Sequence, residues 1–188
     1  EILKDVDFIV LTHIHPDHID ISIEDGTVGA PLNKTIPIFC QNEGDAAILK
    51  KSGFQNITIL SEKSITAGGV TLRKIPARHG TFIPCGDAMG VLFEAENEKT
   101  FYLAGDTIWY DGVKNAIETY HPEENGRLIM DDQDVWNVAQ TAPYTRLYLT
   151  HFNNVAHATI TRHSMRGKLL NYGVTNYDIP EDGETINY

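Results

Sequence analysis

Short hydrophobic runs alternate along the chain with longer amphipathic stretches, which predicts a protein with both strands and helices. Runs rich in Ile, Val, Leu and Phe predict a buried strand at residues 7–11, further strands at 36–40, 56–60, 70–77 and 146–150, and a hairpin over 91–105. Amphipathic stretches predict helices at residues 44–54, 112–121, 131–140 and 160–173. Residues 179–186 indicate only a turn and a short strand.

The order of these elements predicts an α/β fold, because hairpins come first and strands then alternate with helices. One position is irregular. No full hydrophobic strand separates helix 112–121 from helix 131–140, where an α/β layer normally has one. This gap leads to the hypothesis that a strand-containing segment near Pro122 to Gly126 is missing from the sequence.

Composition narrows the class of protein. The 188 residues are enough for one domain with a real core, so we expect a single domain over residues 1–188. A net charge of -11 and the absence of a Lys/Arg cluster argue against a non-specific nucleic-acid binder. No hydrophobic run approaches the roughly 20 residues of a membrane span. The only cysteines, Cys40 and Cys85, favour reduced thiols in a cytoplasmic protein.

The stretch LTHIHPDHID, residues 11–20, places candidate metal ligands directly after a predicted buried strand. His13 and His15 are separated by one residue, so in an extended backbone they point the same way. Asp17 and His18 add a carboxylate and a third imidazole, and Pro16 favours a fixed loop. Surface histidines or helix-capping residues are the alternative interpretation. The density of ligands favours a metal site.

Three further candidates lie where other predicted strands meet loops. His79 follows strand 70–77, Asp106 follows the hairpin 91–105, and His151 follows strand 146–150. Each alone has a simpler interpretation, as a polar strand end or, for Asp106, as a helix N-cap. Together with the first motif they give five histidines and two aspartates at the exits of four strands. Such convergence favours a binuclear metal site with nitrogen and oxygen ligands.

The remaining histidines are weaker candidates. His157 is the best of them for substrate contact or proton delivery, although a supporting or surface role is an equal alternative. His163 lies in an amphipathic stretch and favours a solvated helix face, and His121 ends a predicted helix without an evident role. Trp109 and Tyr110 follow Asp106 and either line a pocket or belong to the core.

The motif THIHPDH resembles the His-x-His-x-Asp-His signature of the metallo-β-lactamase superfamily, and RHG, AGDT and THF resemble its later metal-binding motifs in the same order. The wider sequence, including FYLAGDTIWYDGV and IPEDGE, is similar to the L-ascorbate-6-phosphate-lactonase-like branch of metal-dependent hydrolases. The resemblance implies an α/β, four-layer αββα sandwich of two mixed sheets covered by helices. It also implies β-hairpins before the first motif, so we expect a fold that is incomplete at the N-terminus.

The resemblance further implies a binuclear centre of two divalent ions, with Zn best suited and Mn or Fe also accepted. Such ions activate a water molecule as hydroxide, and Asp17 would have a second, catalytic role in orienting it. The ligand positions carried over are His13, His15 and His79 for one ion, Asp17, His18 and His151 for the other, and Asp106 as the bridge.

These features predict a hydrolase that acts on an ester, lactone, amide or phosphodiester of a small molecule. We expect no nucleic-acid partner and no membrane association, and leave homo-oligomer formation open. A non-catalytic metal-binding or scaffold domain of the same fold is the main alternative. A nuclease is disfavoured by 15 basic against 26 acidic residues. An iron redox protein is disfavoured because the chain has no room for a flavin domain.

Overall fold

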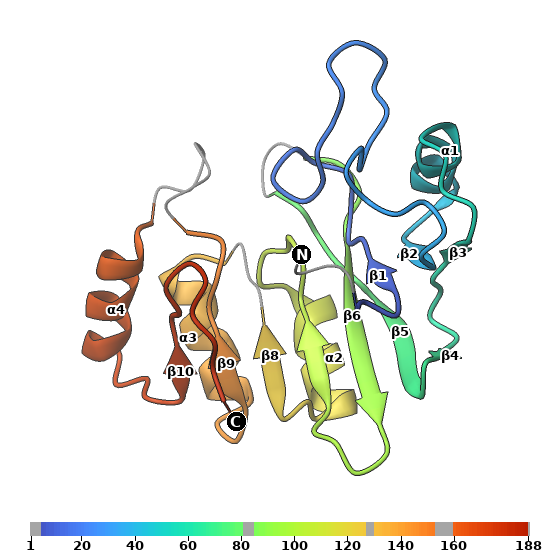
Figure 1. Cartoon of the computed structure of the whole chain (residues 1–188). Helices are drawn as coiled ribbons and strands as arrows, with labels where there is room; N and C mark the ends of the chain where they lie inside the picture. The colour runs from blue at the N-terminus through green and yellow to red at the C-terminus, as the bar shows by residue number, and fades with distance from the viewer. Residues whose placement is uncertain (1–4, 81–84, 127–129, 153–159, 188) are drawn as a thin grey trace. The chain divides into compact units, whose positions relative to one another are not determined.

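The computed structural model describes residues 5–80, 85–126, 130–152 and 160–187 (Figure 1). The chain divides into two compact units, Glu1–Lys74 and Ile75–Tyr188. Each unit has its own hydrophobic core. The expectation of a single domain over the whole chain stays a prediction. In the ranges described, no helix has the length and hydrophobicity needed to cross a membrane.

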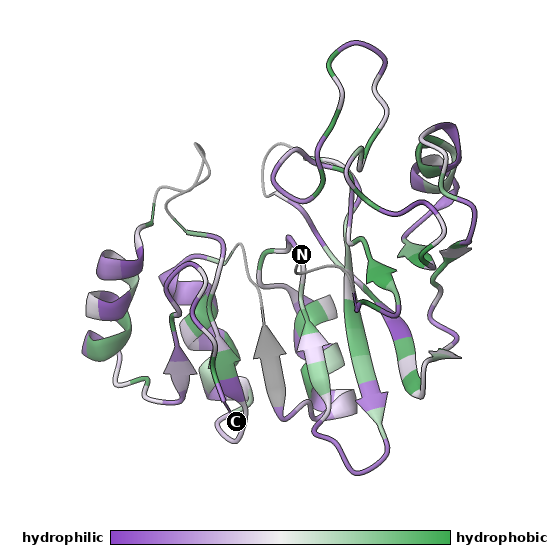
Figure 2. Ribbon diagram, in the orientation of Figure 1, coloured by the Kyte–Doolittle hydropathy of each residue, from purple (hydrophilic) through white to green (hydrophobic). Residues whose placement is uncertain are grey.

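A parallel sheet of three strands, in the order β1-β2-β3, forms the centre of the first unit. Helix α1 connects β2 to β3, since parallel neighbours need a crossover connection. The side chain of Asn42 accepts a hydrogen bond from the Asp45 backbone N–H and so caps the helix start. Strands β1 and β2 are hydrophobic throughout (Figure 2). The bounds are β1 Ile9–Val10, β2 Ile38–Cys40, α1 Glu43–Lys51 and β3 Ile57–Ile59.

A tight hairpin ends the first unit. Strand β4, Ile65–Ala67, pairs antiparallel with β5, Val70–Pro76. Gly68 and Gly69 connect them with φ angles of 55° and 81°, a conformation that side chains with a Cβ rarely adopt. Strand β5 then carries the chain across the boundary between the units and toward His79.

The second unit has a mixed sheet, in which the strands that lie wholly within this unit run in the order β10-β9-β8-β7-β6. Strands β6 and β7 are antiparallel, whereas β7, β8, β9 and β10 are parallel to one another. Buried side chains of α2 and α3 share one core with those of the sheet. The bounds are β6 Met89–Ala95, β7 Phe101–Leu103, α2 Asp111–Tyr120, β8 Glu124–Gly126, α3 Asp132–Thr141, β9 Arg146–Tyr148, α4 Arg162–Asn171 and β10 Tyr177–Asp178.

Strand β8 corrects one sequence-based expectation. The segment near Pro122 to Gly126, where a strand was expected to be missing, itself contains a strand, Glu124–Gly126, between β7 and β9. Its sequence is polar, so hydrophobicity gave no signal for it. The prediction of a short strand within residues 179–186 is also wrong. Strand β10 lies just before that segment, and the described residues there form a turn and irregular structure.

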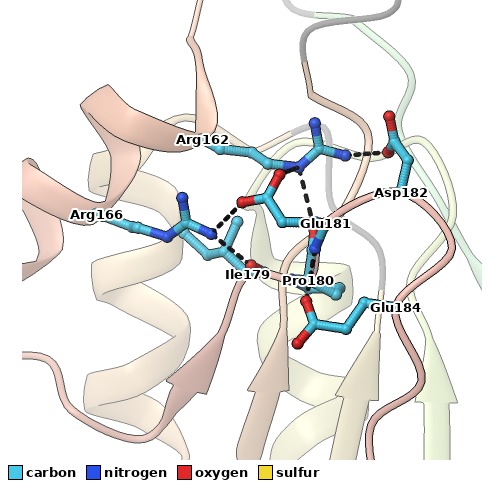
Figure 3. Close-up of polar contacts among 7 residues, drawn as sticks. All are labelled: Arg162, Arg166, Ile179, Pro180, Glu181, Asp182 and Glu184. Carbon is cyan, nitrogen blue, oxygen red and sulfur yellow. Dashed lines mark hydrogen bonds and ion pairs between the residues drawn. The ribbon is translucent and has the colours of Figure 1, made fainter.

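Two arginines of α4 hold the C-terminal segment (Figure 3). Arg166 donates to the Ile179 carbonyl at 2.7 Å and to the Glu181 carboxylate at 2.8 Å. Arg162 donates to the Pro180 carbonyl at 3.0 Å. Because both arginines bind backbone carbonyls as well as carboxylates, they fix the path of the chain after β10. The IPEDGE motif therefore has a structural role in this unit.

Glycine substitutions test the packing of the second unit. A Cβ at Gly90 in β6 would lie 2.9 Å from the Tyr102 ring and 3.1 Å from the Leu103 carbonyl oxygen. Gly90→Ala is therefore expected to lower the free energy of unfolding by about 1–3 kcal/mol. A Cβ at Gly167 in α4 would meet no atom within 4 Å, so Gly167→Ala should raise it by about 0.5–1 kcal/mol. Urea unfolding of both variants checks this opposite pair of signs.

Candidate metal centre

A tight turn in the first unit brings its candidate ligands together. The backbone N–H of His18 donates to the carbonyl of His15 at 3.0 Å, which closes the turn His15-Pro16-Asp17-His18. Proline suits the second position of such a turn because its φ is fixed near the required value. The turn starts from a rigid base, since the N–H of Leu11 donates to the Phe39 carbonyl at 2.9 Å and continues the β1–β2 pairing.

The first half-site, defined as His13, His15, Asp17 and His18, is compact. Nε2 of His13 lies 3.0 Å from Nδ1 of His15. The rings of His13 and His18 have centroids 4.2 Å apart, and Nε2 of His18 lies 3.9 Å from Oδ2 of Asp17. His13 is only 1% exposed. These four side chains therefore lie close together within the first unit, and their role as metal ligands stays a prediction.

Thr12 is a residue that sequence analysis missed. Its hydroxyl lies 3.2 Å from Nδ1 of His13 and 3.5 Å from Nδ1 of His18, and the residue is 4% exposed. A hydroxyl next to Nδ1 restrains the orientation of both rings, and it could accept a hydrogen bond from Nδ1–H if Nε2 binds a cation. The only sequence signal was a hydroxyl residue next to a candidate ligand.

The second half-site, defined as His79, Asp106 and His151, lies in the second unit. Nε2 of His79 is 3.6 Å from Oδ2 of Asp106, and Nε2 of His151 is 3.9 Å from Oδ1 of the same carboxylate. Asp106 is 2% exposed. Its two oxygens therefore face two different imidazoles, which is the arrangement that a bridging carboxylate requires.

Strand ends position these three side chains, as predicted. His79 follows β5, Asp106 follows β7 and His151 follows β9. Gly105, with φ 68°, turns the chain directly before Asp106. His151 itself has φ 71°, a left-handed conformation that costs a non-glycine residue about 1–3 kcal/mol. Such strain is typical of functional sites, where the surrounding structure over-determines the backbone.

The donor set fits divalent metal ions. Imidazole nitrogens and carboxylate oxygens are ligands for zinc, manganese and iron. With Zn–N bonds of about 2.0–2.1 Å, two nitrogens of a tetrahedral site lie roughly 3.3 Å apart. The 3.0 Å between the His13 and His15 nitrogens is close to that spacing. Each half-site therefore consists of candidate ligands for a metal.

Other candidates from the sequence lie elsewhere. His157 falls outside the described residues, so its predicted role in substrate contact or proton delivery stays a prediction. His163 is exposed on α4, as expected for a solvated helix face. His121 ends α2 and its ring lies 2.9 Å from the Tyr144 hydroxyl, which explains it structurally. Trp109 and Tyr110 pack against the core of the second unit, in agreement with the core interpretation.

Comparison with known proteins identifies the family of the chain. Residues 1–152 match the beta-lactamase superfamily domain. The UPF0173 protein YddR of Bacillus subtilis is 33% identical, over all of this chain and 78% of that protein. Two crystal structures are similar over nearly the whole chain. One is a possible metal-dependent hydrolase from Veillonella parvula, with 31% identity, a TM-score of 0.88 and coverage of 98% of this chain and 77% of that one.

The second similar crystal structure is an isothiocyanate hydrolase from Delia radicum gut bacteria, with 29% identity and a TM-score of 0.86. The match covers 99% of this chain and 79% of that one. The fold is thus the metallo-β-lactamase fold, an α/β arrangement that has, in the described ranges, one parallel sheet, one mixed sheet and four helices. The chain belongs to the UPF0173 family of metal-dependent hydrolases within the metallo-β-lactamase superfamily.

Proposed function

We propose that the two half-sites together hold two divalent cations and that the protein uses them to hydrolyse an ester, lactone, amide or phosphodiester of a small molecule. The observation that carries this proposal is the buried carboxylate of Asp106, which faces His79 with one oxygen and His151 with the other. A carboxylate with two imidazole neighbours on opposite oxygens suits a bridge between two ions. Membership of a family of metal-dependent hydrolases supports the same chemistry.

The ligands divide between the two ions by their neighbours within each unit. The His13 and His15 nitrogens lie close together and suit one ion, whereas Asp17 and His18 form a neighbouring pair for the other. Zinc is the best match for this donor set, and manganese or iron would also be accepted. The full assignment is His13, His15 and His79 for the first ion, Asp17, His18 and His151 for the second, and Asp106 for both.

Bound divalent ions would lower the pKa of a water molecule toward about 7 and polarise the bond under attack. The chain's own residues contribute orientation and burial. The carboxylate of Asp17 is partly exposed and can accept a hydrogen bond from the attacking water, which would direct its lone pair. The buried Asp106 and His13 hold their geometry because neighbouring atoms leave them little freedom. We retain His157 as a candidate for substrate contact or proton delivery.

We infer the substrate class from the kind of atom that a metal-activated water attacks, and not from the shape of a pocket. Carbonyl and phosphoryl centres are both attacked by water in sites of this kind. The similarity of FYLAGDTIWYDGV and IPEDGE to the L-ascorbate-6-phosphate-lactonase-like branch favours a lactone. The isothiocyanate hydrolase among the similar structures adds a second electrophilic carbon to test. We propose a cytoplasmic enzyme without nucleic-acid or membrane partners, and leave homo-oligomer formation open.

Replacement of the bridging carboxylate tests the proposal. Asp106→Asn keeps the side-chain volume but removes the charge that two cations would share. We expect the variant to bind fewer than two zinc ions and to lose roughly 10²–10³-fold in kcat/KM. Metal content by mass spectrometry and turnover on a panel of lactones, phosphodiesters, amides and isothiocyanates provide the two measurements.

Asp178→Asn is the matched control, because Asp178 lies in β10 and pairs with Arg146 at 2.7 Å. Its metal content and turnover should equal those of the wild type. Undiminished turnover and full metal content in Asp106→Asn would contradict the bridging assignment.

Removal of the metal gives an independent test. Dialysis against a chelator should abolish hydrolysis, and added Zn²⁺ or Mn²⁺ should restore it. Because cations bind only the folded state, saturation at about 100 times Kd should stabilise the fold by about 2.7 kcal/mol. Thermal unfolding with and without added metal measures this shift. Full turnover by chelator-treated protein, with no metal detectable, would refute the proposed function.

A further inference from the structure

We propose that Thr107 is a positioning residue, whose hydroxyl joins the loop of Asp106 to the exit of β5 and thereby sets the spacing between His79 and Asp106. The inference rests on the proposed function, because it concerns two of the ligands assigned there. Thr107 is buried, with 1% of its surface exposed, although its side chain is polar. A buried hydroxyl is stable only where it has hydrogen-bond partners.

Three hydrogen bonds form a closed junction between the two loops. The backbone N–H of Arg78 donates to the Thr107 hydroxyl at 3.0 Å. The Thr107 hydroxyl donates to the carbonyl of Ile108 at 3.0 Å. The backbone N–H of Ile108 donates in turn to the carbonyl of Arg78 at 2.9 Å. The hydroxyl is thus acceptor and donor at once, which a methyl group in its place could not reproduce.

The junction lies next to both ligands in the sequence. Arg78 immediately precedes His79, and Thr107 immediately follows Asp106. The two ligands are far apart along the chain, yet Nε2 of His79 is 3.6 Å from Oδ2 of Asp106. Arg78 and Thr107 each lie one residue from a ligand and are hydrogen-bonded to each other. A shift of one backbone segment therefore moves the other with it. The Thr107 hydroxyl therefore controls the ligand spacing more directly than any contact further along either strand.

A second tie reinforces the same junction. The phenol of Tyr110 donates to the Pro76 carbonyl, the last residue of β5, at 2.9 Å. The ring lies against Gly112, where a Cβ would approach the ring to 2.3 Å. Only glycine at that position lets Tyr110 reach across to β5. From the other side, the carboxylate of Asp134 in α3 accepts a hydrogen bond from the Trp109 N–H at 3.3 Å.

These contacts explain the motif GDTIWYDG residue by residue. Asp106 supplies the ligand, Thr107 and Tyr110 bind the exit of β5, and Gly112 makes room for the phenol. Outer residues that orient metal ligands contribute strongly to metal affinity. We therefore expect Thr107 to affect metal binding itself, and not only the stability of the fold.

The test compares zinc affinity in Thr107→Val, which keeps the shape and removes the hydroxyl, with Thr107→Ser, which restores it. Competition with a chromophoric chelator measures the dissociation constants. Thr107→Val should bind zinc about 10- to 100-fold more weakly, whereas Thr107→Ser should stay close to the wild type. The visible absorption of the Co²⁺-loaded protein should change in Thr107→Val alone, because the ligand geometry changes. In metal-free protein, the amides of Arg78 and Ile108 should exchange hydrogen faster in that variant.

Thr145→Val is the matched control. Thr145 is also 1% exposed in the same unit, and its hydroxyl donates to the Pro122 carbonyl at 2.7 Å, away from both loops. This variant should lose a similar hydrogen bond and keep wild-type zinc affinity and Co²⁺ absorption. An equal loss of affinity in Thr145→Val would reduce the effect to general stability and overturn the inference.

Tyr110→Phe provides the test if Thr107→Val does not fold. The Tyr110 hydroxyl is nearer the surface than that of Thr107, so its removal is less disruptive to folding. We expect it to weaken zinc binding by several-fold. Wild-type affinity in every folded variant at Thr107 and Tyr110 would overturn the positioning role while leaving the proposed hydrolase intact. A wild-type protein that binds no divalent cation would instead overturn the proposed function itself, and with it this inference.

Discussion

The carboxylate of Asp106 imposes the main geometric constraint on the second unit. It is buried, and its two oxygens face imidazoles that come from the ends of two different strands. Burial of a carboxylate is costly unless its oxygens have partners. The strand ends must therefore arrive with little tolerance in position. The left-handed backbone at His151 and the positive φ of Gly105 are local adjustments that satisfy this requirement.

In each half-site, a threonine next to a candidate ligand restrains the position of that ligand. Thr12 precedes His13 and lies near the Nδ1 atoms of two imidazoles. Thr107 follows Asp106 and joins two loops through their backbones. The first hydroxyl orients rings, and the second orients main chain. Loops on rigid strands need such contacts because a strand fixes only where a loop begins, and not where its side chains point.

The sequence was sufficient for features that depend on spacing and hydrophobicity. The density of candidate ligands after a buried strand predicted a metal site on a loop fixed by Pro16, and the structure has a turn there that brings His13 and His18 together. The ends of β5, β7 and β9 were predicted correctly because a hydrophobic extended run stops at each of them. Strand β8 was not, because its polar residues are held by pairing with neighbours on both sides rather than by their own hydrophobicity.

The roles of Thr12 and Thr107 could not be predicted from the sequence. A threonine beside a ligand is compatible with a β-branched strand residue, a cap or a solvent-exposed hydroxyl. Only the distances to Nδ1 of His13 and to the Arg78 N–H distinguish these roles. Pairing of ligands from distant strands likewise came from the resemblance to a family, since spacing along a chain does not specify which strand ends meet.

Electrostatics connects the proposed centre to the unusual overall charge. The chain carries a formal charge of -11, which disfavours the approach of an anion over long distances. The five histidines of the proposed centre are neutral when they bind a metal, and Asp17 and Asp106 contribute two negative charges. Two divalent cations add four positive charges, so the centre would hold a net charge of about +2.

This local field has the opposite sign to that of the protein as a whole. Inside a site with buried walls such a field is poorly screened, whereas the surface charge is reduced within about 8 Å at physiological ionic strength. The centre would therefore stabilise negative charge that develops on an oxygen during hydrolysis. An acidic surface and an anion-stabilising centre are compatible in one protein. Salt screens the field of the surface charges over a short distance, so that field does not cancel the field of the cations inside the site.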